Sequence, residues 1–185
     1  MLIAVTGYKN SGKNAVCNVL ESEFGFKITG MADALKEQML ILDPYIPVTF
    51  TGFSRLSDLI KFYGWDVCKE RFPEVRRLLQ IGGTEAGRRI FGENIWAEVW
   101  YKRTKVWLEQ GYDICVSDMR FLNEAAFVRE LDGEVWRIYR PGTGGDLHSS
   151  ETELDKIKVD WTIQNNGGLD HLPLLVRSLM TGAGR

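Results

Sequence analysis

The first stretch of the chain restricts its fold more than any other. Met1 to Thr6 reads M-L-I-A-V-T, an apolar run typical of a strand buried on both faces of a parallel sheet. Gly7 to Asn14 follows as G-Y-K-N-S-G-K-N, and from Gly12 to Phe24 apolar side chains recur at helical spacing. A strand, a glycine-rich turn and a helix in this order predict a phosphate-binding loop of the form G-x-x-x-x-G-K-[ST].

Each part of this loop has a physical role. Gly7 and Gly12 let the backbone wrap around a phosphate, and the start of the helix adds the positive end of its dipole. Lys13 can reach the β- and γ-phosphates of a nucleotide. The predicted ATP-binding residues of the loop are Gly7, Lys9, Asn10, Ser11, Gly12, Lys13 and Asn14. The alternative is a tight turn with incidental glycines and a solvated lysine.

Asn14 departs from the motif. A Ser or Thr hydroxyl usually stands here and ligates Mg²⁺. An amide oxygen is also an acceptable Mg²⁺ ligand, directly or through water, so Asn14 is a candidate metal ligand.

The rest of the chain alternates apolar strand-like runs with helical patterns. We predict strands at 26–29, 113–117, 134–139 and 161–164, helices at 31–42, 121–131 and 169–180, a loop at 47–57 and a mainly helical stretch at 56–110. Gly64 and the pair Gly82-Gly83 are expected to end helices within that stretch. This order predicts an α/β fold with a mostly parallel sheet between two layers of helices. We expect one domain over 1–185, with an acceptor-binding region at 31–110 and a lid at 140–153.

Composition excludes several other classes of protein. The formal net charge of -2, with 26% charged residues, argues against a general nucleic-acid binder. Cys17, Cys68 and Cys115 are an odd number without metal-type spacing, so we interpret them as packing residues of a reduced, intracellular chain. The first strand leaves no room for a signal peptide, and no apolar run reaches membrane-spanning length. We therefore predict a cytoplasmic protein that binds neither nucleic acid nor membrane.

A second anion site is predicted in the middle of the chain. Residues 79–96 read L-Q-I-G-G-T-E-A-G-R-R-I-F-G-E-N-I-W, in which Arg88 and Arg89 are adjacent. Guanidinium groups match phosphate oxygens bidentately, so these arginines are candidates for binding an acceptor phosphate. The alternative is a solvated basic face. Further candidates for contacts to the acceptor are Lys36, Gln80, Thr84 and Trp96, although core packing explains the tryptophan equally well.

Asp118 follows the strand at 113–117, where ligands of parallel sheets bind. Its carboxylate can hold Mg²⁺ through water or contact the acceptor, and the alternative is that it caps the following helix. Arg120 and Arg140 are candidates for neutralising charge during phosphoryl transfer, and Arg137 for binding ATP.

Two late motifs leave alternatives open. Asn165, in the turn N-N-G after the last strand, is a candidate adenine contact, and a plain turn is the equal alternative. Glu151, in H-S-S-E, is a candidate acceptor contact, and a helix-capping role for this motif is as well supported.

Together these motifs resemble those of the bacteriophage deoxynucleoside monophosphate kinases. The resemblance rests on G-Y-K-N-S-G-K-N, the stretch at 79–96, S-D-M-R-F-L-N-E, H-S-S-E and I-Q-N-N-G, which span nearly the whole chain. It implies a P-loop fold like that of nucleoside monophosphate kinases, ATP as donor, a deoxynucleoside monophosphate as acceptor, a diphosphate product and dependence on Mg²⁺. It also implies that Lys13 belongs to the donor site, Arg88 and Arg89 to the acceptor phosphate, and Asp118 and Arg120 between them.

Two alternatives remain from the sequence. Animal phosphomevalonate kinases are similar in the phosphate loop and in H-S-S-E, which favours another small-molecule kinase. A nucleotide-binding module without transferase activity is the alternative from a different class. The partners that we expect are small-molecule nucleotides, with a homodimer left open, and the host cytoplasm is the expected compartment if a phage encodes the chain.

Overall fold

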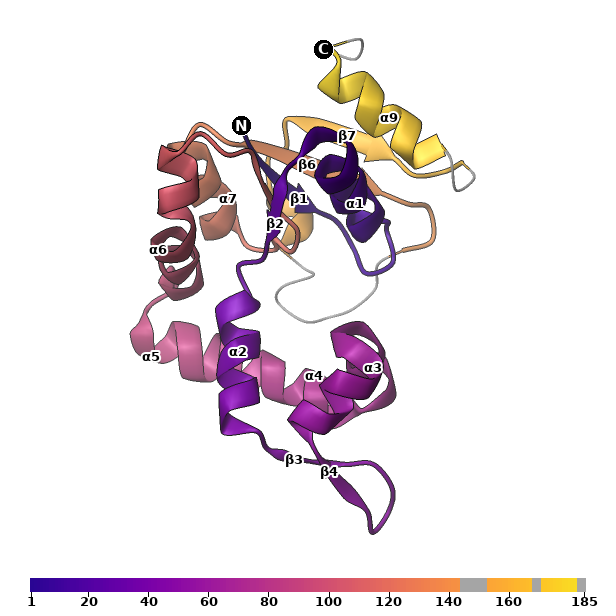
Figure 1. Cartoon of the computed structure of the whole chain (residues 1–185), viewed down its shortest axis with the longest axis vertical. Coiled ribbons are helices and arrows are strands. Elements are labelled where there is room, and N and C mark those ends of the chain that lie inside the picture. Colours follow the sequence, from indigo (N-terminus) through magenta and orange to yellow (C-terminus); the bar gives the residue numbers. More distant parts are fainter. Residues whose placement is uncertain (144–152, 168–170, 183–185) are drawn as a thin grey trace. The chain divides into compact units, whose positions relative to one another are not determined.

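The computed structural model describes residues 1–143, 153–167 and 171–182, which form two compact units (Figure 1). One unit, which we call the sheet unit, comprises Met1–Met31 and Tyr101–Arg185. The other, the helical unit, comprises Ala32–Trp100. The division into a kinase domain with an acceptor region at 31–110 stays a prediction, and most of the expected lid lies outside the described residues.

The sheet unit is built on one five-stranded sheet whose paired strands are all parallel. In spatial order its strands are β2 (Lys27–Thr29), β5 (Ile114–Val116), β1 (Leu2–Thr6), β6 (Glu134–Tyr139) and β7 (Trp161–Gln164). All residues of β1 are buried because strands lie on both sides of it and helices cover its two faces. The predicted strands and the α/β fold are confirmed.

Helices pack on both faces of this sheet. The helices that lie wholly in the sheet unit are α1 (Lys13–Phe24), α7 (Leu122–Glu130) and α9 (His171–Met180), with a short 3₁₀ turn η2 (Leu154–Lys156). Ile3 and Val5 of β1 belong to a core cluster with side chains of α1 and α9. Leu2 points to the opposite face, near Val128 of α7, because successive side chains of a strand alternate.

The helical unit begins with α2 and contains a small hairpin. Its elements are α2 (Asp33–Leu42), β3 (Tyr45–Pro47), β4 (Phe53–Arg55), α3 (Leu56–Arg71), α4 (Pro73–Gln80), the π-helix η1 (Ile81–Arg88), α5 (Arg89–Phe91) and the start of α6 (Ile95–Glu109). The antiparallel pair of β3 and β4 occupies much of the stretch that we expected to be a loop. Ile46 explains the hairpin, because it is fully buried in the core of this unit.

Neither glycine signal ends a helix as predicted. Gly64 kinks α3 with φ 72° and ψ 167°, and the helix continues to Arg71, with Cys68 buried in the core. Gly82 follows α4 inside η1, where a Cβ atom would lie 2.7 Å from Cε of Met39. Gly82 therefore permits close packing of η1 against α2, and tertiary contact overrides its helix-breaking tendency.

The three cysteines are free and buried, which confirms the packing interpretation. Cys17 of α1 and Cys115 of β5 place their sulfur atoms 3.6 Å apart in the core. The hydrogen bond with Cys17 and burial together raise the pKa of Cys115 well above that of an ordinary thiol. Within the described part of the chain, no helix combines the length and apolar character needed to cross a membrane.

Candidate active site

The phosphate loop, Gly7–Asn14, follows the buried strand β1 and leads directly into α1. Gly7 has φ 144° and Gly12 has φ 109°, conformations that favour glycine. A Cβ atom at Gly7 would collide with the carbonyl oxygen of Ile138 in β6. A Cβ atom at Gly12 would lie 2.6 Å from the side-chain nitrogen of Asn165. Both glycines of the motif are therefore required by the shape of the loop and by the strands beside it.

The start of α1 fits an anion. Its N-cap is Gly12, which has no side chain that could accept from the first amides of the helix. The hydroxyl of Ser11, in the same loop, is fully buried and has no hydrogen-bond partner among the described residues, and the same is true of Thr6 at the end of β1. Buried hydroxyls normally find a partner, so an absent ligand accounts for these two. The dipole of α1 favours a negatively charged one.

The ammonium group of Lys13 lies within the loop. Its Nζ donates to the carbonyl oxygens of Gly7 at 2.6 Å and Tyr8 at 2.8 Å. These bonds fold the side chain back from the first turn of α1 over the loop that precedes it. A cation is thereby held where the loop would receive a phosphate.

Three side chains from distant segments hold the outside of the loop. Asn165, directly after β7, donates from Nδ2 to the carbonyl oxygen of Ser11 at 2.7 Å. The hydroxyl of Tyr8 donates to Oδ2 of Asp155 in η2 at 2.6 Å. Arg140 donates from Nη1 to the carbonyl oxygen of Asn10 at 3.5 Å, the edge of hydrogen-bonding distance. The loop is therefore fixed by residues far from it in the sequence.

Sequence reasoning missed Tyr8 and Asp155. Tyr8 occupies a variable position of the motif, and Asp155 lies in a segment without a recognisable pattern. Asn165 was predicted, but as an adenine contact through backbone groups. Its amide instead contacts the loop, while a contact with ATP stays a prediction.

Asp118 lies two residues beyond β5, the strand next to β1, as the sequence predicted. Its Oδ1 accepts from the backbone amide of Met31 at 2.7 Å. The helix that follows is α7, and there Glu124 accepts from the amides of Arg120 at 2.8 Å and Phe121 at 3.1 Å. The helix-capping alternative for Asp118 is therefore wrong, because Glu124 performs that function.

Arg137 contacts the segment around η2. Its Nη2 donates to the carbonyl oxygens of Leu154 at 2.6 Å and Ile157 at 2.8 Å. The guanidinium group thus fixes the segment that carries Asp155. A further role of Arg137 in binding ATP stays a prediction.

The helical unit contains most of the predicted acceptor residues. Arg88, at the end of η1, is buried and donates from Nη1 to the carbonyl oxygen of Glu93 at 2.9 Å, whereas Arg89 is exposed. Trp96 donates from Nε1 to the carbonyl oxygen of Gly83 at 2.8 Å. These bonds tie the two ends of the stretch at 79–96 together around η1. A π-helix at such a place often accompanies a functional site.

The remaining acceptor candidates differ in their surroundings. Lys36 forms an ion pair with Asp33 one turn earlier in α2, at 2.9 Å. Gln80 ends α4 and Thr84 lies in η1, and both are half-buried. Glu151 lies outside the described residues.

Comparison with known proteins places the chain in a family. A family model described as deoxynucleotide monophosphate kinase matches residues 65–175. A protein of Acanthamoeba polyphaga mimivirus named "Putative deoxynucleotide monophosphate kinase" is 32% identical over 182 residues, which cover 90% of this chain and 89% of that protein. This chain belongs to the deoxynucleotide monophosphate kinase family.

Solved structures agree with this deoxynucleotide monophosphate kinase in fold. Dephospho-CoA kinase from Campylobacter jejuni superposes with a TM-score of 0.52 at 15% identity, covering 98% of this chain and 96% of that one. Shikimate kinase from Aquifex aeolicus superposes with a TM-score of 0.49 at 12% identity, covering 100% of this chain and 98% of that one. The sheet unit with its phosphate loop is that of a P-loop kinase.

The described residues of this family member include no group of three His, Cys, Asp or Glu side chains that could hold a metal ion. A Mg²⁺ ion that accompanies a nucleotide needs few protein ligands, because phosphate oxygens and water supply the others. Asn14, exposed in the first turn of α1, and Asp118 are oxygen donors of the kind that such an ion accepts. The residues present therefore fit Mg·ATP.

Proposed function

We propose that this chain transfers the γ-phosphoryl group of ATP to a deoxynucleoside monophosphate, giving ADP and the deoxynucleoside diphosphate. The observation that carries the proposal is the phosphate loop, in which the Lys13 ammonium is folded over the start of α1 beside the unpaired hydroxyl of Ser11. The family of the chain supports a monophosphate as the acceptor.

The loop would bind the β- and γ-phosphates of ATP. Its backbone amides and the positive end of α1 attract the phosphate oxygens, and Lys13 reaches them from within the loop. An oxygen of the acceptor phosphate then attacks the γ-phosphorus, while the bond from that phosphorus to the β,γ-bridging oxygen breaks and ADP leaves. The acceptor phosphate is already anionic at neutral pH, so the step requires no general base.

Arg120 and Arg140 would offset the charge that spreads over the transferred group. Arg140 contacts the loop at Asn10, and Arg120 lies two residues beyond Asp118. Cations held in place before the reaction stabilise developing charge without reorganising, which is why they accelerate transfer. Mg²⁺, when bound, would supply further neutralisation of the phosphates, with Asn14 and Asp118 as its protein ligands directly or through water.

The acceptor would bind through the stretch at 79–96. Arg89 is exposed and can form a bidentate pair with the acceptor phosphate, while buried Arg88 is held by the carbonyl of Glu93. Lys36, Gln80, Thr84 and Trp96, with Asp118 and Glu151, complete the proposed acceptor contacts.

The test is a coupled assay of ADP production with ATP and Mg²⁺ and a panel of acceptors. The panel holds the deoxy- and ribonucleoside monophosphates, phosphomevalonate and a blank without acceptor. We expect ADP production that depends on a deoxynucleoside monophosphate. Turnover of phosphomevalonate alone would identify a different kinase, and acceptor-independent ADP production would identify a nucleotide-binding module.

Lys13→Ala tests the loop in the same assay. We expect kcat to fall by about 10²- to 10³-fold, the usual effect of removing one preorganised group from a charged transition state. Lys102→Ala is the matched control, since it removes an exposed lysine of α6 outside the proposed site. Circular dichroism checks that both variants are folded. Near-normal turnover by Lys13→Ala would remove the loop from the mechanism.

A further inference from the structure

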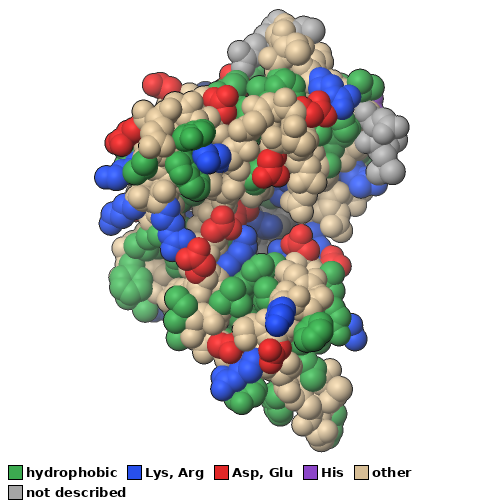
Figure 2. All heavy atoms as spheres, viewed as in Figure 1, with side chains coloured by type: hydrophobic (Ala, Val, Ile, Leu, Met, Phe, Trp, Pro, Cys, Tyr) green, Lys and Arg blue, Asp and Glu red, His purple; other side chains and the backbone are tan. Residues whose placement is uncertain are grey.

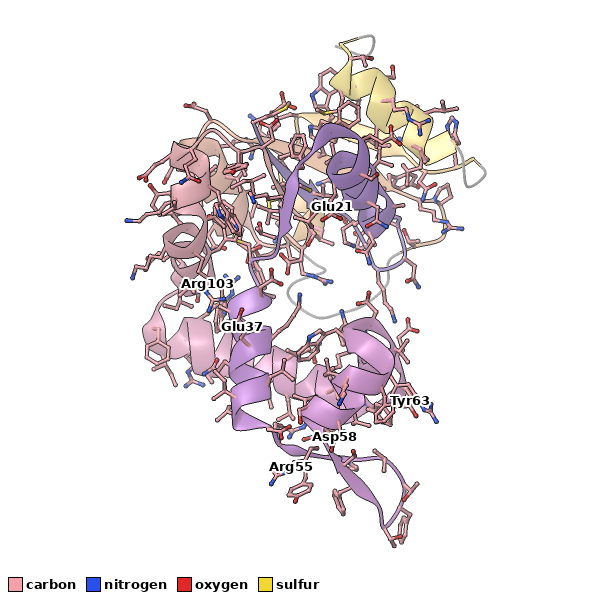
Figure 3. All side chains as sticks on the ribbon, viewed as in Figure 1. Glu21, Glu37, Arg55, Asp58, Tyr63 and Arg103 are labelled. Atoms are coloured by element: carbon pink, nitrogen blue, oxygen red, sulfur yellow. The ribbon has the colours of Figure 1, made fainter. Side chains whose placement is uncertain are left out.

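The hairpin of β3 and β4 presents an exposed aromatic face. Its two strands pair Tyr45 with Arg55 and Pro47 with Phe53, and these four side chains lie on the face opposite to buried Ile46. Tyr45 is 61% exposed and Phe53 is 63% exposed. Phe50, at the turn, is fully exposed. Hydrophobic side chains at this surface are visible in Figure 2, and Arg55 is labelled in Figure 3.

The hydrogen bonds of the hairpin show which backbone groups face outward. The amide of Val48 donates to the carbonyl oxygen of Gly52 at 2.8 Å, and the amide of Leu56 donates to that of Pro44 at 3.0 Å. In an antiparallel pair, hydrogen-bonded and non-hydrogen-bonded positions alternate. The residues of β4 that lie between the bonded positions, Phe53 and Arg55, therefore direct their amide and carbonyl groups away from β3.

The two edges of the hairpin are not equivalent. Pro47 has no N–H group, so the outer edge of β3 lacks a donor that pairing with another strand would need. Helix α4 also packs against β3. The outer edge of β4 retains both donors and acceptors, which makes β4 the edge that can accept another strand.

We propose that two copies of this chain associate by antiparallel pairing of β4 with β4. A two-fold axis at Ser54 places Phe53 of each copy opposite Arg55 of the other. The outward-facing amide and carbonyl groups of these two residues then exchange both backbone hydrogen bonds. The hairpin is thus self-complementary, as a two-fold interface requires. This proposal does not rest on the proposed function.

The side chains are complementary in the same register. The guanidinium carbon of Arg55 already lies 4.0 Å from the ring centroid of Tyr45 in its own chain. Pairing would bring the Phe53 ring of the second copy to the same face, so that the cation has an aromatic ring on the neighbouring strand of each copy. The two hairpins would form one four-stranded sheet with an aromatic and cationic face.

The area available suits a reversible dimer. A fully buried aromatic side chain covers about 150–250 Å². From the exposures of Tyr45, Phe50 and Phe53, the aromatic area that each copy could bury is about 450 Å². The total of roughly 900 Å², before backbone and neighbouring groups are added, approaches the lower limit of about 1,200 Å² for stable interfaces. We therefore expect dissociation in the micromolar range.

Sedimentation velocity across the micromolar range tests the proposal with three variants. Phe53→Lys places a lysine opposite Arg55 of the second copy, and we expect the dimer dissociation constant to rise by at least ten-fold. Phe53→Glu removes the same ring but places a carboxylate opposite that arginine, so its dissociation constant should stay within a few-fold of the wild type. Phe91→Lys changes a phenylalanine of α5 that is 70% exposed and should have no effect.

Each result decides the matter. A wild-type chain that stays monomeric overturns the proposal, as does equal weakening by Phe53→Lys and Phe53→Glu. Weakening by Phe91→Lys would place the interface elsewhere. Because Phe53 is largely exposed, circular dichroism should show all three variants folded.

A cross-link checks the register independently. Ser54 would face its own copy across the axis at a non-hydrogen-bonded position, where Cβ atoms lie about 4.5–5.5 Å apart. Under mild oxidation Ser54→Cys should give a covalent dimer on a non-reducing gel. Thr51→Cys, in the exposed turn, is the matched control and should give little. A dimer linked by the control and not by Ser54→Cys would refute the register.

Discussion

The hydrogen bond between Tyr8 and Asp155 allows the support of the phosphate loop to be measured directly. The Tyr8 hydroxyl donates to the Asp155 carboxylate at 2.6 Å, across 147 positions of the sequence. Arg137 holds the same segment through the carbonyl oxygens of Leu154 and Ile157. Tyr8→Phe removes one hydroxyl from this arrangement and leaves the ring in place.

The size of the effect follows from the exposure of the bond. Hydrogen bonds to charged groups contribute about 1.5–3 kcal/mol when shielded from water, and neutral ones about 0.5–1.5 kcal/mol. The bond from Tyr8 to Asp155 is exposed, so we expect about 1 kcal/mol. That free energy corresponds to roughly a five-fold change in an equilibrium constant. If the loop must hold this shape to bind ATP, KM for ATP should rise about five-fold while kcat stays within two-fold.

A double-mutant cycle provides the assay. Tyr8→Phe, Asp155→Ala and the double variant are compared by urea unfolding and by ATP titration. Because the two residues share one bond, the double variant should lose about 1 kcal/mol less unfolding free energy than the two single variants added together. Tyr112→Phe is the control, since it removes the hydroxyl of an exposed tyrosine whose ring contacts Lys27.

Two results would refute this reasoning. Strict additivity of the single variants would show that the bond contributes nothing. Coupling in the unfolding experiment, without a change in KM, would show that the bond stabilises the fold but does not position the loop.

Two further predictions concern the loop and the core beneath it. Gly7→Ala, which forces a methyl group against the Ile138 carbonyl, should cost about 1–3 kcal/mol and raise KM for ATP more than ten-fold; Gly25→Ala, with φ 73° and open space around it, should leave KM unchanged, and equal effects would contradict the steric argument. The raised pKa of Cys115 means that the native state keeps its proton at pH values where the unfolded thiol, with a pKa of about 8.5, loses it, so unfolding free energy should fall as pH rises above about 8.5 and Cys115→Val should make that fall smaller in urea unfolding at pH 7 and 9.5; an unchanged slope would contradict this.

Helix-ending signals were the weakest part of the sequence reasoning. Gly64 and Gly82 both carry the right local signal, yet α3 continues through a kink and η1 continues against α2. In each case the apolar side chains beyond the glycine are buried in the core of the helical unit. Burial of those side chains outweighs the roughly 1 kcal/mol that a glycine costs inside a helix.

The hairpin was missed for a related reason. Its strands are only three residues long, and the exposed aromatic residues around Ile46 do not alternate over a long enough stretch to predict strands. Burial of Ile46 among α2, α3 and α4 fixes the hairpin, and that burial exists only in the folded unit.

The sequence by itself determined the strand, loop and helix at the start of the chain. This unit is local: the conformations of Gly7 and Gly12, the position of Lys13 and the apolar spacing of α1 all follow from adjacent residues. The alternation of later strands and helices then sufficed for the parallel sheet.

Only the tertiary structure decided what holds that loop in place. Asn165 reaches Ser11 because β6 and β7 lie beyond β1 in the sheet, and Asp155 reaches Tyr8 because Arg137 anchors η2. Such contacts join residues about 150 positions apart, so no sequence spacing encodes them. They form once the order of the strands brings the chain segments together, because a hydrogen bond depends on distance in space and not on separation along the chain.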